Sequence, residues 1–149
     1  MWRNNREIDG NQIDDDSNGY IDDMLGWDFT QNDNKPMDET GHGTHVAGII
    51  GAEVDNRIGI AGVAWKSRVM AIRVGSSSYY GGVGMRDSNS AAGIIYAADN
   101  GAKVINMSWG SDRSSFVLQD AINYAYVRGA FLVAAGGNNM NSEAIFPAG

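Results

Sequence analysis

The chain has 149 residues, which is the size of one ordinary globular domain and enough to bury a core. Its net charge of −7 argues against nucleic-acid binding, because basic patches supply most of that affinity. The absence of cysteine excludes disulfides, and no apolar stretch of the sequence reaches the length that spans a membrane.

The first forty residues form a polar segment rich in Asp and Asn, without sustained periodicity, so we expect mostly loops there. The acidic residues of this segment are Glu7, Asp9, Asp14, Asp15, Asp16, Asp22, Asp23, Asp28, Asp33, Asp38 and Glu39, and its basic residues are Arg3, Arg6 and Lys35. So many like charges repel one another unless a cation is bound or the segment stays loose.

Helical and extended patterns alternate after this segment. The apolar residues Val46, Ala47, Ile49 and Ile50 predict a short buried helix. A turn near Gly59 is expected after it. Residues 68–74 are predicted to form a strand, and residues 75–84 a loop rich in Gly and Ser.

The second half of the chain continues the alternation. We predict an Ala-rich helix over residues 90–100, a strand over 103–107, a helix over 115–128 and a strand over 131–135. The apolar residues of the second helix follow the 3.6-residue spacing: Leu118, Ala121, Ile122 and Ala125. Gly101 and Gly129 are suitable helix stops. The last strand is apolar throughout, as expected for a strand that is covered on both faces.

Strands that alternate with helices imply an α/β fold with a parallel sheet and right-handed crossovers. Active sites in such folds gather at the carboxyl ends of the strands. His42, Ser108 and Asn138 fall at the ends of predicted elements or in loops, which permits a shared site.

The segment Gly41-His42-Gly43-Thr44-His45-Val46-Ala47-Gly48 sets a histidine between glycines at the predicted start of a helix. Histidine is the side chain best suited to moving protons near neutral pH, although a histidine at a helix start can also be purely structural. The segment resembles the histidine motif of the subtilisin-like serine proteases (subtilases).

Four further segments resemble subtilases in the same order along the chain. They are residues 56–64, the loop after the histidine helix; 106–110, the strand and loop that line the substrate cleft; 133–138, the turn with the oxyanion asparagine; and 146–148, a Tyr-Pro-Ala-like element. The resemblance covers roughly residues 40–148, and the Asp-rich opening resembles an insertion found in some subtilases. It implies a three-layer α/β fold, a mostly parallel twisted sheet with helices on both faces, here incomplete.

The resemblance also implies the roles of individual residues in peptide-bond hydrolysis. His42 would be the general base, and Asn138 would stabilise the tetrahedral oxyanion. The segment Ser108, Trp109 and Gly110 would form one wall of the substrate cleft. Ala135 and Gly137 would line the opposite wall of the pocket for the residue before the scissile bond, where small residues keep a pocket open to large apolar side chains.

Structural alternatives exist for several of these residues. His42 and His45, three residues apart, could suggest a zinc pair, but a third ligand and a helix-borne glutamate are not evident. We expect His45 to be packed and hydrogen-bonded, without a role in proton transfer. Asn138 also suits a plain turn, and Trp109 also suits a cap on the core. Ser108 lacks the flanking residues of a catalytic serine.

Residues 14–23 resemble the first half of a calcium loop, with oxygen ligands at alternate positions and Gly at the sixth. The expected ligands are Asp14, Asp16, Asn18, the Tyr20 carbonyl, and Asp22 or Asp23. The glutamate that closes an EF-hand is missing, and a solvated acidic loop is the alternative. Asn56, with the carbonyls of Val54, Ile58 and Ile60, resembles another calcium loop of subtilases, whose additional N-terminal ligands are absent here.

Subtilases carry their catalytic residues in the order Asp, His, Ser. No Asp-Thr-Gly or Asp-Ser-Gly segment precedes His42, and no Gly-Thr-Ser-Met-Ala-like segment follows Asn138. We therefore expect residues 1–40 to be a calcium-loop segment and 41–149 a partial catalytic domain of a secreted, extracellular endopeptidase that cleaves peptides or proteins. Alone, the chain should be inactive. The alternative is a non-catalytic calcium-binding module on a protease-like scaffold.

Overall fold

The computed structural model describes residues 1–77, 83–138 and 144–149. The chain divides into two compact units, an N-terminal unit of Met1–Gly84 and a C-terminal unit of Met85–Gly149. This division by spatial contacts differs from the division by composition at residue 40. None of the helices in these described ranges combines the length and the apolar character that crossing a membrane requires.

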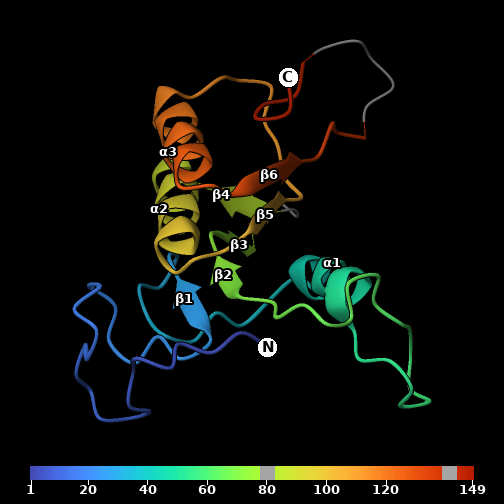
Figure 1. The fold of residues 1–149 in the computed structure, drawn as a ribbon. Helices are drawn as coiled ribbons and strands as arrows, with labels where there is room; N and C mark the ends of the chain where they lie inside the picture. Colours follow the sequence, from blue (N-terminus) through green and yellow to red (C-terminus); the bar gives the residue numbers. More distant parts are fainter. Residues whose placement is uncertain (78–82, 139–143) are drawn as a thin grey trace. The chain divides into compact units, whose positions relative to one another are not determined.

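The N-terminal unit is mostly loop up to residue 41, as predicted, and contains two short parallel strands (Figure 1). Strand β1 (Gly26–Asp28) pairs with β2 (Ala71–Arg73), and helix α1 (His42–Gly51) lies between them in the sequence. Only glycine fits at residue 26, because its φ is +136° and a β-carbon there would lie 1.7 Å from the carbonyl oxygen of Ala71. This glycine therefore permits the strand pairing.

Three predictions for this unit differ from the structure. The strand expected over residues 68–74 is limited to β2, and α1 contains no buried residue, so the expectation of a buried helix is wrong. The loop expected over residues 75–84 begins with β3 (Gly75–Ser77) and runs into β4 (Val83–Met85), and these strands pair. Residues 78–82, the middle of that predicted loop, lie outside the described residues.

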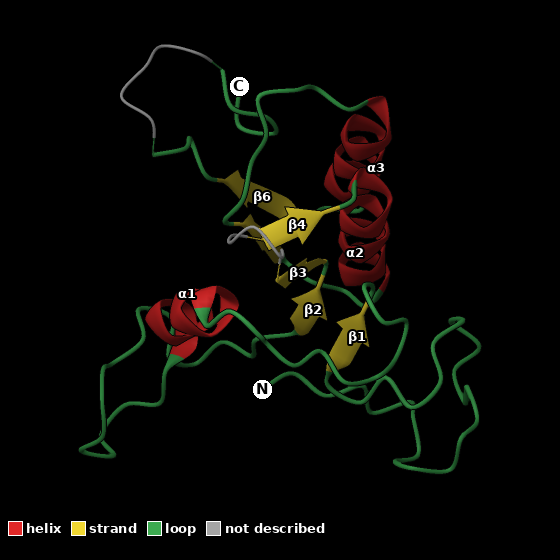
Figure 2. Cartoon of the chain, turned by 180° about the vertical axis from the view of Figure 1, so that it is seen from behind, coloured by secondary structure: helices red, strands yellow, loops and turns green. Residues whose placement is uncertain are grey.

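The C-terminal unit has the predicted order of helix, strand, helix and strand. Its two helices lie side by side (Figure 2). Its elements are α2 (Asp87–Asp99), β5 (Val104–Met107), α3 (Phe116–Val127) and β6 (Phe131–Ala134). Strands β5 and β6 are parallel, with Val104 opposite Phe131 and Met107 opposite Ala134. The parallel α/β class predicted from the sequence is therefore confirmed.

Apolar side chains from both helices and from the sheet form one core in this unit. The buried members are Ala91, Ile94, Ala98, Met107, Leu118, Ala121, Ala125 and Ala130. Gly101 and Gly129 follow the helices with φ angles of +78° and +84°, as expected of helix-ending glycines.

One face of the β5–β6 sheet packs against this core, and the other face does not. Ile105 and Leu132 pack inward, whereas Val104, Phe131 and Val133 are exposed by 60%, 69% and 41%. The expectation that the last strand is covered on both faces is therefore wrong within the described residues. In this unit helices α2 and α3 supply one helical layer of the architecture.

Candidate active site

His42 is the first residue of α1 and is exposed. The helix begins after Gly41, whose φ of +81° lies in the left-handed region that glycine adopts without strain. The backbone N–H of His42 faces the Thr40 hydroxyl at 3.4 Å. The imidazole is therefore presented at the surface of a helix start, as the sequence predicts.

The carboxylate of Asp38 holds the turn around His42 in place. One oxygen accepts hydrogen bonds from the Thr40 N–H (2.8 Å), the Thr40 hydroxyl (3.1 Å) and the Gly41 N–H (3.0 Å). The other accepts from the N–H and the hydroxyl of Thr44, both at 2.8 Å. These donors, the Thr44 N–H first and the Thr40 N–H next, hold the pKa of Asp38 well below its usual range. The carboxylate therefore ties residues on both sides of His42 together.

Glu39 connects the same turn to the β1–β2 strand pair. The Arg73 guanidinium on β2 binds Glu39 at 2.6 Å and Asp28 at 2.7 Å. Asp28 is fully buried at the end of β1. Burial raises the pKa of Asp28, but hydrogen bonds from Thr30 and Gln31 and the charge of Arg73 outweigh burial, and the net shift is downward.

Sequence reasoning missed both Asp38 and Glu39 as residues that position the histidine. For Asp38 a signal was available, because acidic side chains just before a helix favour its N-terminus. For Glu39 no local signal was available, because its partner Arg73 comes much later in the sequence, after α1.

The predicted substrate-binding segments lie together in the C-terminal unit. Ser108, Trp109 and Gly110 follow β5, and Ala135 and Gly137 follow β6. Because the two strands are parallel, both segments leave the same end of the sheet, and the Ala135 N–H donates to the Met107 carbonyl at 3.0 Å. Trp109 also packs against the core, as the structural alternative predicted.

Asn138 is exposed and follows Gly137, whose φ is +87°. This glycine turns the chain directly after the β6 segment, so that the asparagine is displayed beyond the end of the sheet. Asn138 belongs to the C-terminal unit and His42 to the N-terminal unit. Each residue lies at an exposed turn within its own unit.

Ile145, which sequence reasoning did not single out, lies between the two substrate-binding segments. A β-carbon at Gly110 would lie 2.4 Å from its Cγ2 atom, and a β-carbon at Gly137 would lie 2.9 Å from its Cγ1 atom. No periodicity could have revealed this contact, because the three residues come from separate parts of the chain.

His45 lies one turn after His42 in α1 and is exposed, so the expectation that it is packed is wrong. In the part of the chain that the structure describes, the group of side chains placed to share a metal ion consists of Glu7, Asp14 and Asp16. Neither histidine belongs to it.

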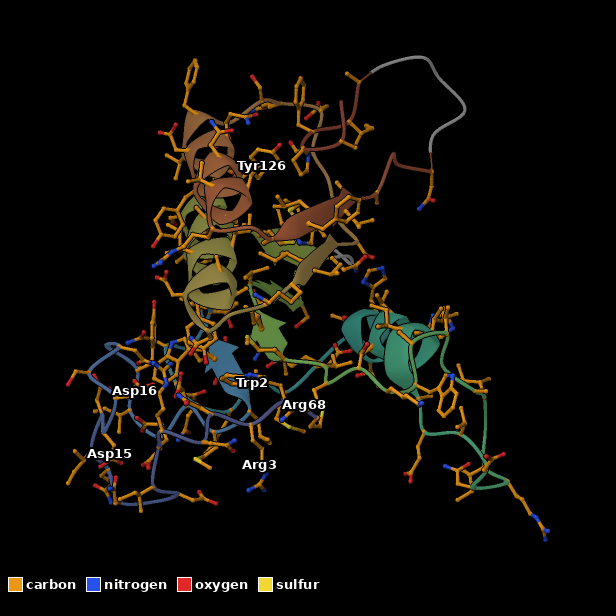
Figure 3. The ribbon with its side chains drawn as sticks, in the orientation of Figure 1. Trp2, Arg3, Asp15, Asp16, Arg68 and Tyr126 are labelled. Atoms are coloured by element: carbon orange, nitrogen blue, oxygen red, sulfur yellow. The ribbon has the colours of Figure 1, made fainter. Side chains whose placement is uncertain are left out.

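The acidic loop of the N-terminal unit brings these three carboxylates together, and their ligand oxygens lie within 4.8 Å of one another. Figure 3 shows Asp15 and Asp16 on this loop. Asp16 also pairs with Arg6 at 2.9 Å, and the Asn4 amide donates to it at 3.1 Å. Glu7, which is buried, was absent from the ligands predicted from the sequence.

The other predicted ligands of this loop also form hydrogen bonds within the protein. Asp22 accepts hydrogen bonds from the backbone N–H groups of residues 10–12, and Asp23 accepts from the side-chain amides of Asn4 and Asn18. Asn18 accepts from the Tyr20 N–H at 2.8 Å. Asp22 and Asp23 therefore organise the loop by hydrogen bonding.

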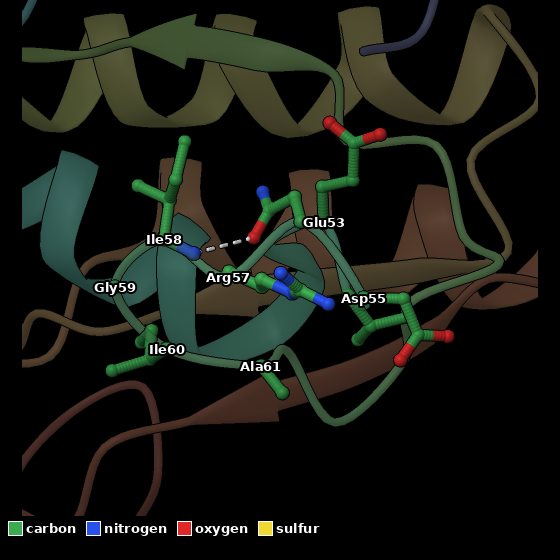
Figure 4. A pocket seen from close by; sticks show the side chains of 9 residues that line it. Glu53, Asp55, Arg57, Ile58, Gly59, Ile60 and Ala61 are labelled. Atoms are coloured by element: carbon green, nitrogen blue, oxygen red, sulfur yellow. Dashed lines mark hydrogen bonds between the residues drawn. The ribbon is translucent and has the colours of Figure 1, made fainter.

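The loop around Asn56 surrounds a hollow of about 180 Å³ that is open to solvent and lined by residues 53–61 (Figure 4). Asp55, Arg57 and Gly59 have φ angles of +60°, +60° and +63°, so left-handed residues alternate with others along the loop. The Asn56 side-chain oxygen accepts a hydrogen bond from the Ile58 N–H at 3.0 Å. Two non-glycine residues in left-handed backbone indicate a strained loop.

Comparison with known proteins identifies close relatives. A family model described as the subtilase family matches residues 4–148. The chain is 48% identical over 125 residues to the thermophilic serine proteinase of Bacillus sp. (strain AK1), a match that covers 84% of this chain and 30% of that protein. It is 47% identical over 123 residues to thermitase of Thermoactinomyces vulgaris, covering 83% of this chain and 43% of thermitase.

Solved structures give the same result. The S41 psychrophilic protease matches with a TM-score of 0.72 and 33% identity, over 81% of this chain and 41% of that one. Fervidolysin from Fervidobacterium pennivorans is described as a keratinolytic enzyme related to subtilisin. It matches with a TM-score of 0.71 and 35% identity, over 97% of this chain and 22% of fervidolysin. The chain thus spans less than half the length of these relatives.

Proposed function

The chain belongs to the subtilase family, and on that premise we propose that it supplies the general base and the oxyanion-binding amide of a serine-type endopeptidase. The observation that carries the proposal is the family match over residues 4–148, a range that includes the turns of both His42 and Asn138. The substrates would be peptides or proteins, and by the same resemblance the location would be extracellular.

His42 would take the proton from a serine hydroxyl as that hydroxyl attacks a peptide carbonyl, and would then give it to the leaving amine. Its exposed position at the start of α1 and the hydrogen bonds of Asp38 around it support this role. The Asn138 amide would donate to the carbonyl oxygen as that oxygen becomes negative.

We propose that residues 1–149 on their own form no acyl-enzyme, because no segment of the sequence matches the family's motif for the catalytic serine. A fluorophosphonate probe, which labels activated serines, should leave this polypeptide unlabelled. The product of the complete reading frame that encodes these residues should be labelled and should hydrolyse peptides.

Substitutions at the two histidines make the sharpest test on the complete product. His42→Ala should abolish labelling and hydrolysis, whereas His45→Ala, one helical turn away on the same helix, should retain both. Asn138→Ala should lower kcat by roughly 10²–10³-fold, the magnitude measured when such a donor is removed from a subtilisin. A complete product that binds calcium but shows neither labelling nor hydrolysis would support the non-catalytic module instead.

We further propose that the acidic loop of the N-terminal unit binds calcium. Calcium prefers six to eight oxygen ligands, and the converging carboxylates of Glu7, Asp14 and Asp16 fit that chemistry. Asn18 and the Tyr20 carbonyl, which are next in the predicted loop, would complete the set. Of the ligands predicted for the other loop, only Asn56 offers a side-chain oxygen, so we propose that this loop holds an ion only with ligands from outside the predicted set.

Calorimetry and thermal unfolding test the calcium proposal without relying on activity. Calcium at one hundred times its dissociation constant should stabilise the protein by about 2.7 kcal/mol. Asp14→Asn should remove most of the binding heat and of the stabilisation, whereas the matched change Asp9→Asn, at an exposed position of the same segment, should leave both. Equal behaviour of the two variants would contradict the assignment.

A further inference from the structure

We propose that Ile145 restricts this protease to substrates with a small residue, such as glycine, alanine or serine, immediately before the scissile bond. The inference rests on the proposed endopeptidase function, because it assigns a substrate class to the same site. It concerns only the C-terminal unit, where the two walls of the proposed pocket and Ile145 all lie.

Two backbone hydrogen bonds fix the position of Ile145. The Ser111 N–H donates to the Phe146 carbonyl at 2.9 Å, and the Phe146 N–H donates to the Ser111 carbonyl at 2.8 Å. This antiparallel bridge holds residues 145 and 146 against the segment that follows β5. The backbone that directly follows Ile145 is therefore anchored to the residue after Gly110.

The side chain of Ile145 fills the space above both glycines of the predicted pocket. A β-carbon built at Gly110 would lie 2.4 Å from the nearest atom of Ile145, and one built at Gly137 would lie 2.9 Å from it. Both distances are shorter than any ordinary carbon–carbon contact. The nearest atoms are in both cases branches of the same isoleucine, Cγ2 on one side and Cγ1 on the other. Ile145 thus spans from one proposed wall to the other.

This arrangement reverses the expectation from the sequence, in which small residues at positions 135 and 137 keep a pocket open to large apolar side chains. The space that Gly137 and the facing Gly110 leave free is taken up by the side chain of Ile145. A β-branched residue has restricted χ1 rotation, so the isoleucine cannot easily swing aside while its backbone stays bridged. A large substrate side chain would have to displace it, whereas a methyl or hydroxymethyl group would not.

The direct test is a series of variants, Ile145→Val, Ile145→Ala and Ile145→Gly, in the product of the complete reading frame. Each is assayed with two peptides that differ only in having Ala or Phe before the scissile bond. The native protein should prefer Ala. The ratio of kcat/KM for Phe over Ala should rise stepwise along the series, by roughly 10–100-fold for Ile145→Gly, since burying an aromatic side chain has that effect.

Ile95→Ala is the matched control, because Ile95 is an isoleucine on α2 in the same unit and is 38% exposed. It should leave the Phe-to-Ala ratio unchanged. Two outcomes would overturn the role of Ile145 and leave the proposed function intact. One is a series of active variants whose Phe-to-Ala ratio stays constant from the native protein to Ile145→Gly. The other is a native protein that prefers Phe. Absence of fluorophosphonate labelling and of hydrolysis already in the native product would instead overturn the proposed function.

A second measurement needs no activity. In the same preparations, benzene should shift the amide NMR signals of Gly110 and Gly137 in Ile145→Gly and leave them in place in the native protein, because a vacated apolar space binds such probes. That result would support the claim that the Ile145 side chain fills this space, whatever the assays give. An equal response of the native protein and the variant, or no response of either, would overturn that claim.

Discussion

In the C-terminal unit nearly all buried side chains are apolar, and they come from two helices and the sheet that they cover. In the N-terminal unit the buried side chains include Asn4 and the carboxylates of Glu7, Asp22, Asp23 and Asp28. Hydrophobic burial thus stabilises one unit, and hydrogen bonds to buried carboxylates organise the other. A buried carboxylate is tolerated only when it is paired, so each of these must keep its partners.

Glu7 illustrates the difference. Its two carboxylate oxygens accept hydrogen bonds from the backbone N–H groups of Asp16 and Asp22, at 3.1 and 3.0 Å. A leucine side chain in the other unit, such as that of Leu118, packs among apolar neighbours instead. The N-terminal unit should therefore respond to pH and to cations, and the C-terminal unit should respond mainly to changes in side-chain volume.

The largest effect is expected for Asp28→Ala in the N-terminal unit. The substitution leaves Arg73, whose side chain is only 9% exposed, without its buried partner. Breaking a buried ion pair in this way should lower the free energy of unfolding by about 3–5 kcal/mol, as measured by denaturant unfolding. Asp9→Ala, at an exposed position, is the control and should change it by less than about 0.5 kcal/mol.

A somewhat smaller effect is expected for Leu118→Ala in the C-terminal unit. Leu118 is 8% exposed and belongs to the apolar core, so the substitution leaves a cavity. The free energy of unfolding should fall by roughly 2–5 kcal/mol, and by a similar amount at pH 4 and pH 7. The neighbouring Val117, which is 55% exposed, provides the control Val117→Ala. A strong pH dependence of the Leu118 effect would contradict the contrast between the units.

The smallest effect is expected for Asp38→Ala, which removes the hydrogen bonds around His42. Loss of such a capping carboxylate should lower the free energy of unfolding by about 1 kcal/mol at pH 7. The folded-state pKa of Asp38 is lowered, so its contribution is fully present above the ordinary carboxyl pKa of about 4 and is lost as the pH falls below it. Native protein and variant should therefore differ less at pH 2 than at pH 7, and an unchanged difference would contradict this account.

The contrast between the units also explains what the sequence could predict. Helix α3 and strands β5 and β6 lie within a residue or so of their predicted ranges, because apolar spacing directly records packing against one core. Helix α2 begins three residues earlier than predicted, at Asp87, where polar residues give no periodic signal. Strands β3 and β4 were missed, because their Gly- and Ser-rich sequence resembles a loop.

The candidate site, like the fold, could be predicted from the sequence only in part. The motif around His42 and the segments after β5 and β6 could be found from local sequence, because the small residues that mark each of them are close together in the sequence. Glu7 and Ile145 could not, since their roles depend on contacts with residues distant in the chain. Asp38 could have been recognised as a capping residue before the helix that begins at His42.

A crystal structure of the complete reading-frame product with a bound peptide inhibitor tests the proposed catalytic pair most directly. We predict that an imidazole nitrogen of His42 and the amide nitrogen of Asn138 both lie roughly 3 Å from the reacting group of the inhibitor. If the two side chains instead point to opposite sides of the molecule, the chain does not supply this pair, and the proposed protease mechanism is contradicted.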